Sequence, residues 1–198
     1  MGQHAELQPN PGGGFAVRYV PDDPKLDPLV MVRDVAASIV AAAKKYSLEL
    51  PEITIEPGRS IVAPAGVAVY RVGSVKKGSR TYVAVDGGMS DNPRPVLYGA
   101  GYEAYLPARI DEPRPLVCSI AGKHCEQGDI VVRDAQLPSD LAVGEVLATP
   151  VTGAYGLSLA SNYNKVTRPA VVFVRDGSAR LVVRRETDSD LVRLDADA

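Results

Sequence analysis

The chain has 198 residues, 45% of them hydrophobic, so it can bury a sizeable core in one or two domains. A formal net charge of -2 gives no basic surface for nucleic acid. The sequence contains no long apolar run and no signal-peptide pattern, so we expect a cytoplasmic protein that does not enter the membrane. Two cysteines and two histidines without paired spacing predict neither a disulfide framework nor a metal site.

The first predicted element is a helix that begins at Asp27. Asp27 can cap the helix, and Pro28 suits its first position. We expect the helix to end near Lys45, where basic side chains suit the negative end of the dipole. Apolar residues recur on one face, at Leu29, Val32, Ala36, Ile39, Val40 and Ala43. The run at residues 53–55, in PEITIEP, then predicts a short buried strand, so this region is typical of an α/β unit.

From about residue 60 the pattern predicts strands. Residues 61–76 and 80–88 form two β-rich runs separated by a turn near residues 77–79. Further strands are predicted over residues 102–110, 114–122, 129–135, 170–177 and 179–186. A final short helix is predicted over residues 187–194. The chain is therefore predicted to be α+β, with a short α/β part followed by a mostly antiparallel β part.

Two motifs lie in the α/β part. Three successive glycines precede the helix, and free backbone N–H groups there could bind phosphate, although a glycine triplet is also typical of a flexible loop. In EPGR, Glu56 and Arg59 follow the predicted strand. The carboxylate could hold a protonated ring nitrogen and the guanidinium an anion. An ordinary turn with a local ion pair would explain the same residues.

Three more motifs lie in the β part. In DNPRPVLYG, Arg94 lies between two prolines and Tyr98 follows four residues later. This pattern is typical either of an anion-binding site or of a rigid surface loop. KHCEQGD places Cys125 beside Glu126. The thiol of Cys125 could donate a proton, and the carboxylate of Glu126 could bind an ammonium. An inert structural cysteine is the alternative. In TGAYG, Tyr155 lies near two glycines, which would suit either a ligand contact or an ordinary loop aromatic.

The order of these motifs, GGG, EPGR, DNPRP, CE-x-GD and GAYG, resembles that of the fold III pyridoxal-phosphate decarboxylases. The resemblance implies that residues 1–60 are the final βα unit or units of a (β/α)8 barrel that binds the cofactor. Residues 61–198 would form a mostly antiparallel β-barrel or sandwich domain, whose last few residues could pack back on the barrel. Two prolines of LQPNP fall where the family has a barrel strand.

The resemblance implies pyridoxal 5'-phosphate as cofactor. In the family the glycine triplet binds the cofactor phosphate, and the acid of EPGR pairs with the pyridine nitrogen. The EPGR arginine serves the phosphate or a substrate carboxylate, and the GAYG tyrosine contacts cofactor and substrate. The cofactor-binding residues implied here are Gly12, Gly13, Gly14, Glu56, Gly58, Arg59 and Tyr155.

The resemblance also implies a catalytic residue and a substrate site. Cys125 would protonate the carbon that loses carbon dioxide, and Glu126 would bind the amino group at the far end of the substrate. The substrate-binding residues implied are Arg59, Arg94, Tyr98, Glu126 and Tyr155. In family members the Cys-Glu pair reaches into the partner's site, which implies a homodimer with active sites shared across the interface.

The implied reaction is decarboxylation of meso-2,6-diaminopimelate to L-lysine, in lysine biosynthesis. Glu126 suits the distal amine, and Arg59 and Arg94 suit the distal carboxylate. The alternatives are an ornithine- or arginine-type decarboxylase and a non-catalytic homologue that pairs with a decarboxylase subunit and regulates it. No lysine here matches the one that binds the cofactor covalently in the family. We therefore expect the chain to work with a separate N-terminal barrel half and to be inactive alone.

Overall fold

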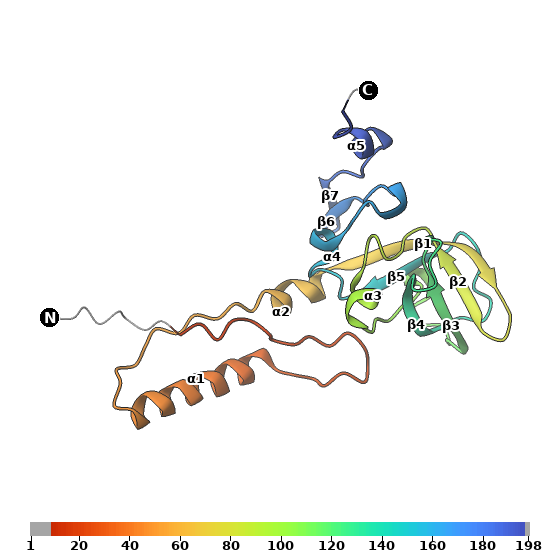
Figure 1. Cartoon of the computed structure of the whole chain (residues 1–198). Helices are drawn as coiled ribbons and strands as arrows, with labels where there is room; N and C mark the ends of the chain where they lie inside the picture. The colour runs from red at the N-terminus through yellow and green to blue at the C-terminus, as the bar shows by residue number, and fades with distance from the viewer. Residues whose placement is uncertain (1–8, 197–198) are drawn as a thin grey trace.

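The computed structural model describes residues 9–196, so the first eight residues and the last two residues of the predicted domains lie outside it. Helix α1 (Pro28–Lys45) begins and ends as predicted, and the Asp27 carboxylate accepts a hydrogen bond from the Leu29 N–H at 2.8 Å. The helix extends away from the sheet as a separate arm (Figure 1). Of the apolar face predicted for α1, Ala43 is the residue that becomes buried, while Leu29 and Val40 stay exposed.

The segments on either side of α1 lie next to each other in parallel. Gly12 and Ile55 form a parallel bridge, and the Thr54 N–H donates to the Pro9 carbonyl at 3.3 Å. Pro9 therefore takes part in this pairing as an acceptor, through its carbonyl, so its missing N–H does not prevent the contact. The strand predicted over residues 53–55 is reduced to this bridge, and it is half-buried rather than buried, since no further strand covers it within the described residues.

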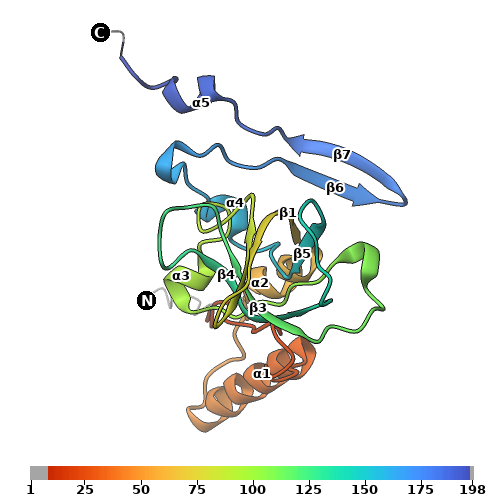
Figure 2. The same cartoon turned by 90° about the vertical axis from the view of Figure 1, so that its right-hand side faces the viewer.

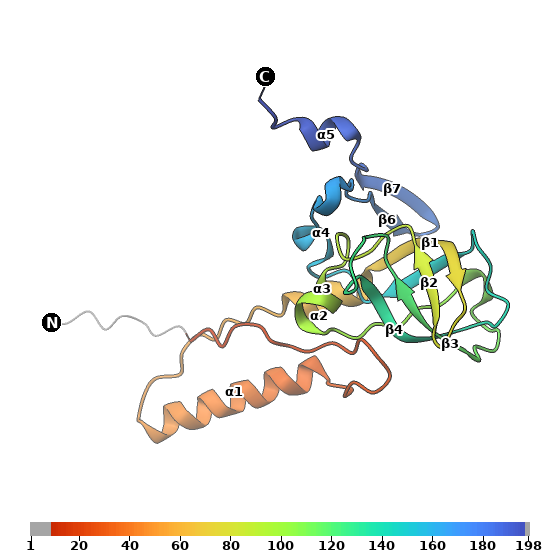
Figure 3. The same cartoon turned by 45° about the vertical axis from the view of Figure 1, so that its right-hand side comes forward.

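A curled five-stranded sheet forms the main body of the chain (Figure 3). Its strands run in the order β4-β3-β2-β1-β5. Strands β2 and β3 pair in parallel, and the other neighbours pair antiparallel, in line with the mostly antiparallel prediction. The strands are β1 (Val67–Lys76), β2 (Thr81–Val85), β3 (Leu116–Ala121), β4 (Ile130–Leu137) and β5 (Val146–Pro150).

The long strand β1 explains the curl. Its first half, from Val67 to Arg71, pairs with β5, whereas its second half pairs with β2. The register with β2 shifts between Val72 and Ser74, and such a bulge increases the local twist. The sheet folds around a core of apolar side chains that include Val72, Val83, Ile120, Leu137 and Leu147.

Two predicted strand segments are not strands. Residues 61–65 belong to the short helix α2 (Gly58–Val62) and the 3-10 turn η1 (Ala63–Ala65), where Pro64 suits the first turn of a helix but not a strand interior. In the predicted strand over residues 102–110, residues 102–106 run as a loop with one bridge, Tyr105 to Ala148, and the 3-10 turn η2 (Pro107–Arg109) follows. Strand β5 was not predicted.

The C-terminal part lies on the other side of the sheet from α1 (Figure 2). It contains the predicted hairpin of β6 (Val171–Arg175) and β7 (Ser178–Val183), followed by α5 (Asp188–Val192). The remaining short elements are α3 (Arg94–Tyr98), α4 (Gly156–Leu159) and the 3-10 turn η3 (Tyr163–Lys165). Within residues 9–196 no helix is long and apolar enough to cross a membrane.

One buried leucine and one exposed leucine allow the assigned core to be tested by stability measurements. Leu147 is fully buried between β1 and the rest of the core, whereas Leu181 on β7 is 59% exposed. Leu147→Ala should lower the free energy of unfolding by about 2–5 kcal/mol, because it leaves a cavity. Leu181→Ala should cost less than about 0.5 kcal/mol. Urea unfolding of both variants measures the difference, and equal costs would contradict the assigned core.

Candidate active site

The glycine triplet and EPGR meet at the ends of the two parallel segments. The Glu56 N–H donates to the Gly12 carbonyl at 2.9 Å. A Cβ placed on Gly13 would lie 2.5 Å from the Glu56 carbonyl oxygen, so glycine is required at that contact. The two motifs, far apart in the sequence, therefore form one surface at the ends of the two parallel segments.

The space beyond this surface is open. Gly12 and Gly14 have φ angles of +79° and +81°, and a Cβ on either would meet nothing within 4 Å. The exposed Glu56 carboxylate accepts a hydrogen bond from Asn10 Nδ2 at 2.7 Å. Between Glu56 and Arg59 the described residues show no ion pair, so the local-ion-pair interpretation of EPGR is wrong. The Gly58 N–H donates to the Glu56 carbonyl at 2.9 Å and stabilises the turn.

Four other predicted residues line a cavity of about 440 Å³, together with Leu159. They are Arg59, Arg94, Tyr98 and Tyr155. Arg94 begins α3, and its side chain is buried, with 7% of its surface exposed. The guanidinium carbon of Arg94 lies 5.6 Å from the Tyr98 ring centre and 5.9 Å from that of Tyr155. These distances bring four predicted residues from three separate motifs together.

Two further tyrosines, which the sequence did not single out, hold Arg94. Arg94 Nε donates to the Tyr102 hydroxyl at 3.0 Å, and its guanidinium carbon lies 5.1 Å from the Tyr19 ring centre. The Tyr19 and Tyr102 rings meet edge to face at 5.2 Å. Burial raises the pKa of Tyr102, which keeps it neutral. Aromatic faces stabilise a cation without neutralising it, so Arg94 retains its charge for an anion.

Arg59 offers a second donor to the same cavity. It lies in α2, and its guanidinium carbon is 5.9 Å from the Tyr155 ring centre. Arg59 Nε is buried and has no hydrogen-bond partner among the described residues. A buried donor without a partner is costly, so Arg59 Nε is suited to donate to an acceptor in this cavity.

Two glycines make the approach of Arg59 and Tyr155 sterically feasible. A Cβ on Gly153 would lie 1.9 Å from the Val62 carbonyl oxygen, and one on Gly66 would lie 2.2 Å from the Gly153 Cα. The chain before Tyr155 can therefore pack directly on the end of α2. Tyr155 itself has φ of +64° as it enters α4.

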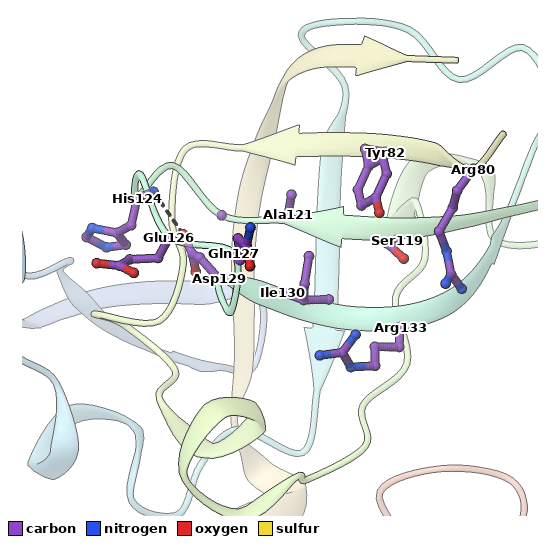
Figure 4. A pocket seen from close by; sticks show the side chains of 11 residues that line it. Arg80, Tyr82, Ser119, Ala121, His124, Glu126, Gln127, Asp129, Ile130 and Arg133 are labelled. Carbon is purple, nitrogen blue, oxygen red and sulfur yellow. Dashed lines mark hydrogen bonds between the residues drawn. The ribbon is translucent and has the colours of Figure 1, made fainter. Parts of the chain in front are cut away.

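Cys125 and Glu126 lie in the loop between β3 and β4, and both are exposed. Glu126 accepts a hydrogen bond from the Tyr163 hydroxyl. Glu126 lines a different cavity, of about 480 Å³, on the side of β2, β3 and β4 shown in Figure 4. Within one chain the structure therefore does not bring Glu126 to the cavity of Arg59 and Arg94.

Sequence reasoning also missed residues that anchor the Cys125 loop. His124 and Asp129 flank Cys125 in the quoted motif KHCEQGD, and both are buried. The Asp129 carboxylate accepts a hydrogen bond from the His124 N–H at 2.8 Å. A pair of charged or polar residues on either side of an exposed cysteine was the available signal.

Comparisons with known proteins show the family to which the chain belongs. Residues 19–153 match the family described as pyridoxal-dependent decarboxylase, C-terminal sheet domain. A diaminopimelate decarboxylase of Bacillus subtilis is 52% identical over 188 residues, which cover 94% of this chain and 43% of that protein. One from Actinosynnema pretiosum is 50% identical over 183 residues, covering 92% of this chain and 41% of that protein.

A solved structure shows the same fold. The diaminopimelate decarboxylase of M. jannaschii in co-complex with L-lysine superposes with a TM-score of 0.83 and 36% identity, over 96% of this chain and 43% of that chain. The chain thus spans less than half the length of the relatives that it matches.

The close contacts of Gly153 beside the cavity predict that a side chain at this position lowers the stability of the protein. Gly153→Ala should destabilise the protein by roughly 2 kcal/mol or more, because its Cβ would clash with backbone that cannot move freely. Gly156→Ala is the matched control, since a Cβ there meets nothing within 4 Å. Thermal unfolding of both variants tests this. Equal melting temperatures would mean that the close packing beside Tyr155 is absent.

Proposed function

The chain belongs to the pyridoxal-dependent decarboxylases, and we propose that it supplies the C-terminal part of an enzyme that decarboxylates meso-2,6-diaminopimelate to L-lysine. The convergence of Arg59, Arg94 and Tyr155 on one cavity carries this proposal. The relatives at 52% and 50% identity, both diaminopimelate decarboxylases, support the choice of substrate. A biosynthetic enzyme of this kind suits the cytoplasm.

The residues at the strand ends fit pyridoxal 5'-phosphate. The cofactor, when bound, supplies the electron sink for the pair released with carbon dioxide. Gly12, Gly13 and Gly14 would hold its phosphate through their backbone N–H groups, since they carry no side chains. Glu56 would keep its ring nitrogen protonated. Arg59, whose buried Nε has no protein partner, and Tyr155 complete the cofactor site, and Gly58 shapes the turn between them.

The distal end of the substrate carries a carboxylate and an ammonium, which require partners of opposite charge. Arg59 and Arg94 bind a carboxylate, and Tyr98 borders the same cavity. Glu126 binds the ammonium at the distal end. Cys125 donates the proton that takes the place of the departing carboxylate on the reacting carbon. The L-lysine in the M. jannaschii co-complex is the product that this reaction would release.

The separation of the two cavities supports a dimer. Glu126 lines one cavity, and the two arginines line another. We propose a homodimer in which Cys125 and Glu126 of one chain complete the site of its partner. Both residues are exposed, as such an arrangement requires.

Helix α1 and the two segments beside it support the division of the chain into a barrel part and a β domain. Residues 1–60 provide the last strands and helix of a (β/α)8 barrel, and residues 61–198 form the β domain. The parallel bridge of Gly12 and Ile55, with α1 between its two segments, is the connectivity of a βαβ unit. Exposed apolar residues on α1, such as Leu29 and Val40, suit contact with further barrel segments supplied by an N-terminal half.

Activity of a reconstituted enzyme tests the function. This chain is joined to the part of the Bacillus subtilis relative that it does not match, and the fusion is given pyridoxal phosphate and meso-diaminopimelate. We expect release of carbon dioxide and formation of L-lysine, whereas the chain alone should give neither. In the fusion, Cys125→Ala should lower kcat by about 10²–10⁴-fold with little change in KM, because the thiol acts as a general acid.

L-Ornithine serves as the control substrate, because it lacks the distal carboxylate that Arg59 and Arg94 bind. A fusion that binds the cofactor and decarboxylates L-ornithine in preference to meso-diaminopimelate would overturn the proposed substrate. Unchanged kcat in Cys125→Ala would overturn the proposed role of the thiol.

The dimer makes a separate prediction. Arg94→Ala and Cys125→Ala fusions, each with strongly lowered activity alone, are mixed and allowed to exchange chains. If Cys125 acts in the partner's site, mixed dimers contain one intact site, and part of the activity should return. Carbon dioxide release is compared with that of each parent at the same total concentration. Mixed dimers that form without any recovery would show that Cys125 and Arg94 serve the same site from one chain.

A further inference from the structure

The Glu126 carboxylate is held by a tyrosine from a distant part of the chain. The Tyr163 hydroxyl donates to Glu126 Oε1, and 37 residues separate the two in the sequence. Tyr163 begins the 3-10 turn η3, whereas Glu126 lies in the β3–β4 loop. Among the described residues, Tyr163 is the side chain that forms a hydrogen bond with this carboxylate. The orientation of Glu126 in the exposed loop therefore depends on η3.

The Tyr163 ring is in turn supported by His124. The two ring centres lie 5.5 Å apart at an angle of 47°. His124 is buried, with 8% of its surface exposed, and its Nε2 lies 2.8 Å from the hydroxyl oxygen of Ser90. In Figure 4, His124 and Glu126 lie side by side at one end of the cavity. His124 thus provides a fixed surface beneath the tyrosine.

Ser90 joins η3 to the loop that precedes Arg94. Its carbonyl accepts a hydrogen bond from the Ser161 N–H at 3.0 Å, and its hydroxyl contacts His124. Ser90 is buried, so both contacts are shielded from water. The segment that carries Tyr163 is therefore fixed relative to the loop that carries Glu126.

We propose that Tyr163 is a positioning residue that orients the Glu126 carboxylate toward the distal ammonium of the substrate, with His124 setting the position of the Tyr163 ring. This inference rests on the proposed role of Glu126 as the ammonium partner. A neutral hydroxyl suits the task because it fixes one carboxylate oxygen and leaves the negative charge available for the ammonium. A lysine or arginine at the same place would neutralise that charge.

The raised pKa of Tyr163 is consistent with this role. The hydrogen bond to Glu126, followed by burial, raises the pKa of Tyr163 above its ordinary value. The hydroxyl therefore keeps its proton, and remains a donor, at neutral pH.

The test uses Tyr163→Phe in the reconstituted enzyme. The substitution keeps the ring against His124 and removes the hydroxyl alone. We expect KM for meso-diaminopimelate to rise about three- to tenfold, with kcat changed less than about twofold, because an oriented charge partner of the bound substrate is lost. Tyr46→Phe is the matched control, since Tyr46 is an exposed tyrosine beyond α1, and KM should not change. An unchanged KM in Tyr163→Phe would overturn the proposal.

A double substitution separates positioning from direct contact. Glu126→Gln should raise KM by itself, and adding Tyr163→Phe should raise it no further if Tyr163 acts through Glu126. Additive effects would show that Tyr163 acts independently of Glu126, and the inference would fail.

Spectroscopy distinguishes failure of this inference from failure of the proposed function. In the same enzyme labelled with ¹³Cζ-tyrosine, the Tyr163 signal is identified by its loss in Tyr163→Phe. The Tyr163 pKa should fall toward its ordinary value in Glu126→Gln. An unchanged Tyr163 pKa would overturn the inference and leave the proposed function standing. A lowered Tyr163 pKa with no effect of Glu126→Gln on KM would instead overturn the role of Glu126 in substrate binding.

Discussion

The buried carboxylate of Asp129 holds together the two loops that carry the candidate substrate residues. It accepts hydrogen bonds from the Met89 N–H at 2.7 Å and the His124 N–H at 2.8 Å, and 2% of its residue surface is exposed. A buried carboxylate requires such donors, because transferring it from water to the protein interior has a large free-energy cost. A Cβ on Gly88 or Gly122 would lie 2.6 or 2.1 Å from the same carboxylate, so the space it needs exists because both are glycine.

This arrangement fixes the geometry of both candidate half-sites. Met89 precedes the loop that delivers Arg94 to one cavity, and His124 precedes the Cys125 and Glu126 loop beside the other. The two loops are tied at their bases, while their functional side chains serve separate cavities. A single chain thus presents the two candidate half-sites in a fixed relation, as the proposed dimer with shared sites would require.

Local signals explain what the sequence could predict. Asp27, Pro28 and the terminal lysines determine α1, and most strands follow from β-branched runs. Prediction failed where a proline interrupts such a run, at Pro64 and Pro107, and it missed β5, which ends in the run Ala148, Thr149 and Pro150. The motifs identified Arg94 and Glu126, but not their supports. Tyr19, Tyr102 and Tyr163 reach them through tertiary contacts that no local pattern encodes.

The surroundings of two arginines show how the chain separates structural from functional charge. Arg109 forms ion pairs with three carboxylates, which neutralise it and hold the η2 segment to the sheet. Arg94 is more deeply buried, yet among the described residues it forms no ion pair with a carboxylate. Its contacts are the faces and hydroxyls of tyrosines. Aromatic rings offset part of the cost of burial without neutralising the guanidinium, so Arg94 keeps a positive charge for the carboxylate that the proposed function assigns to it.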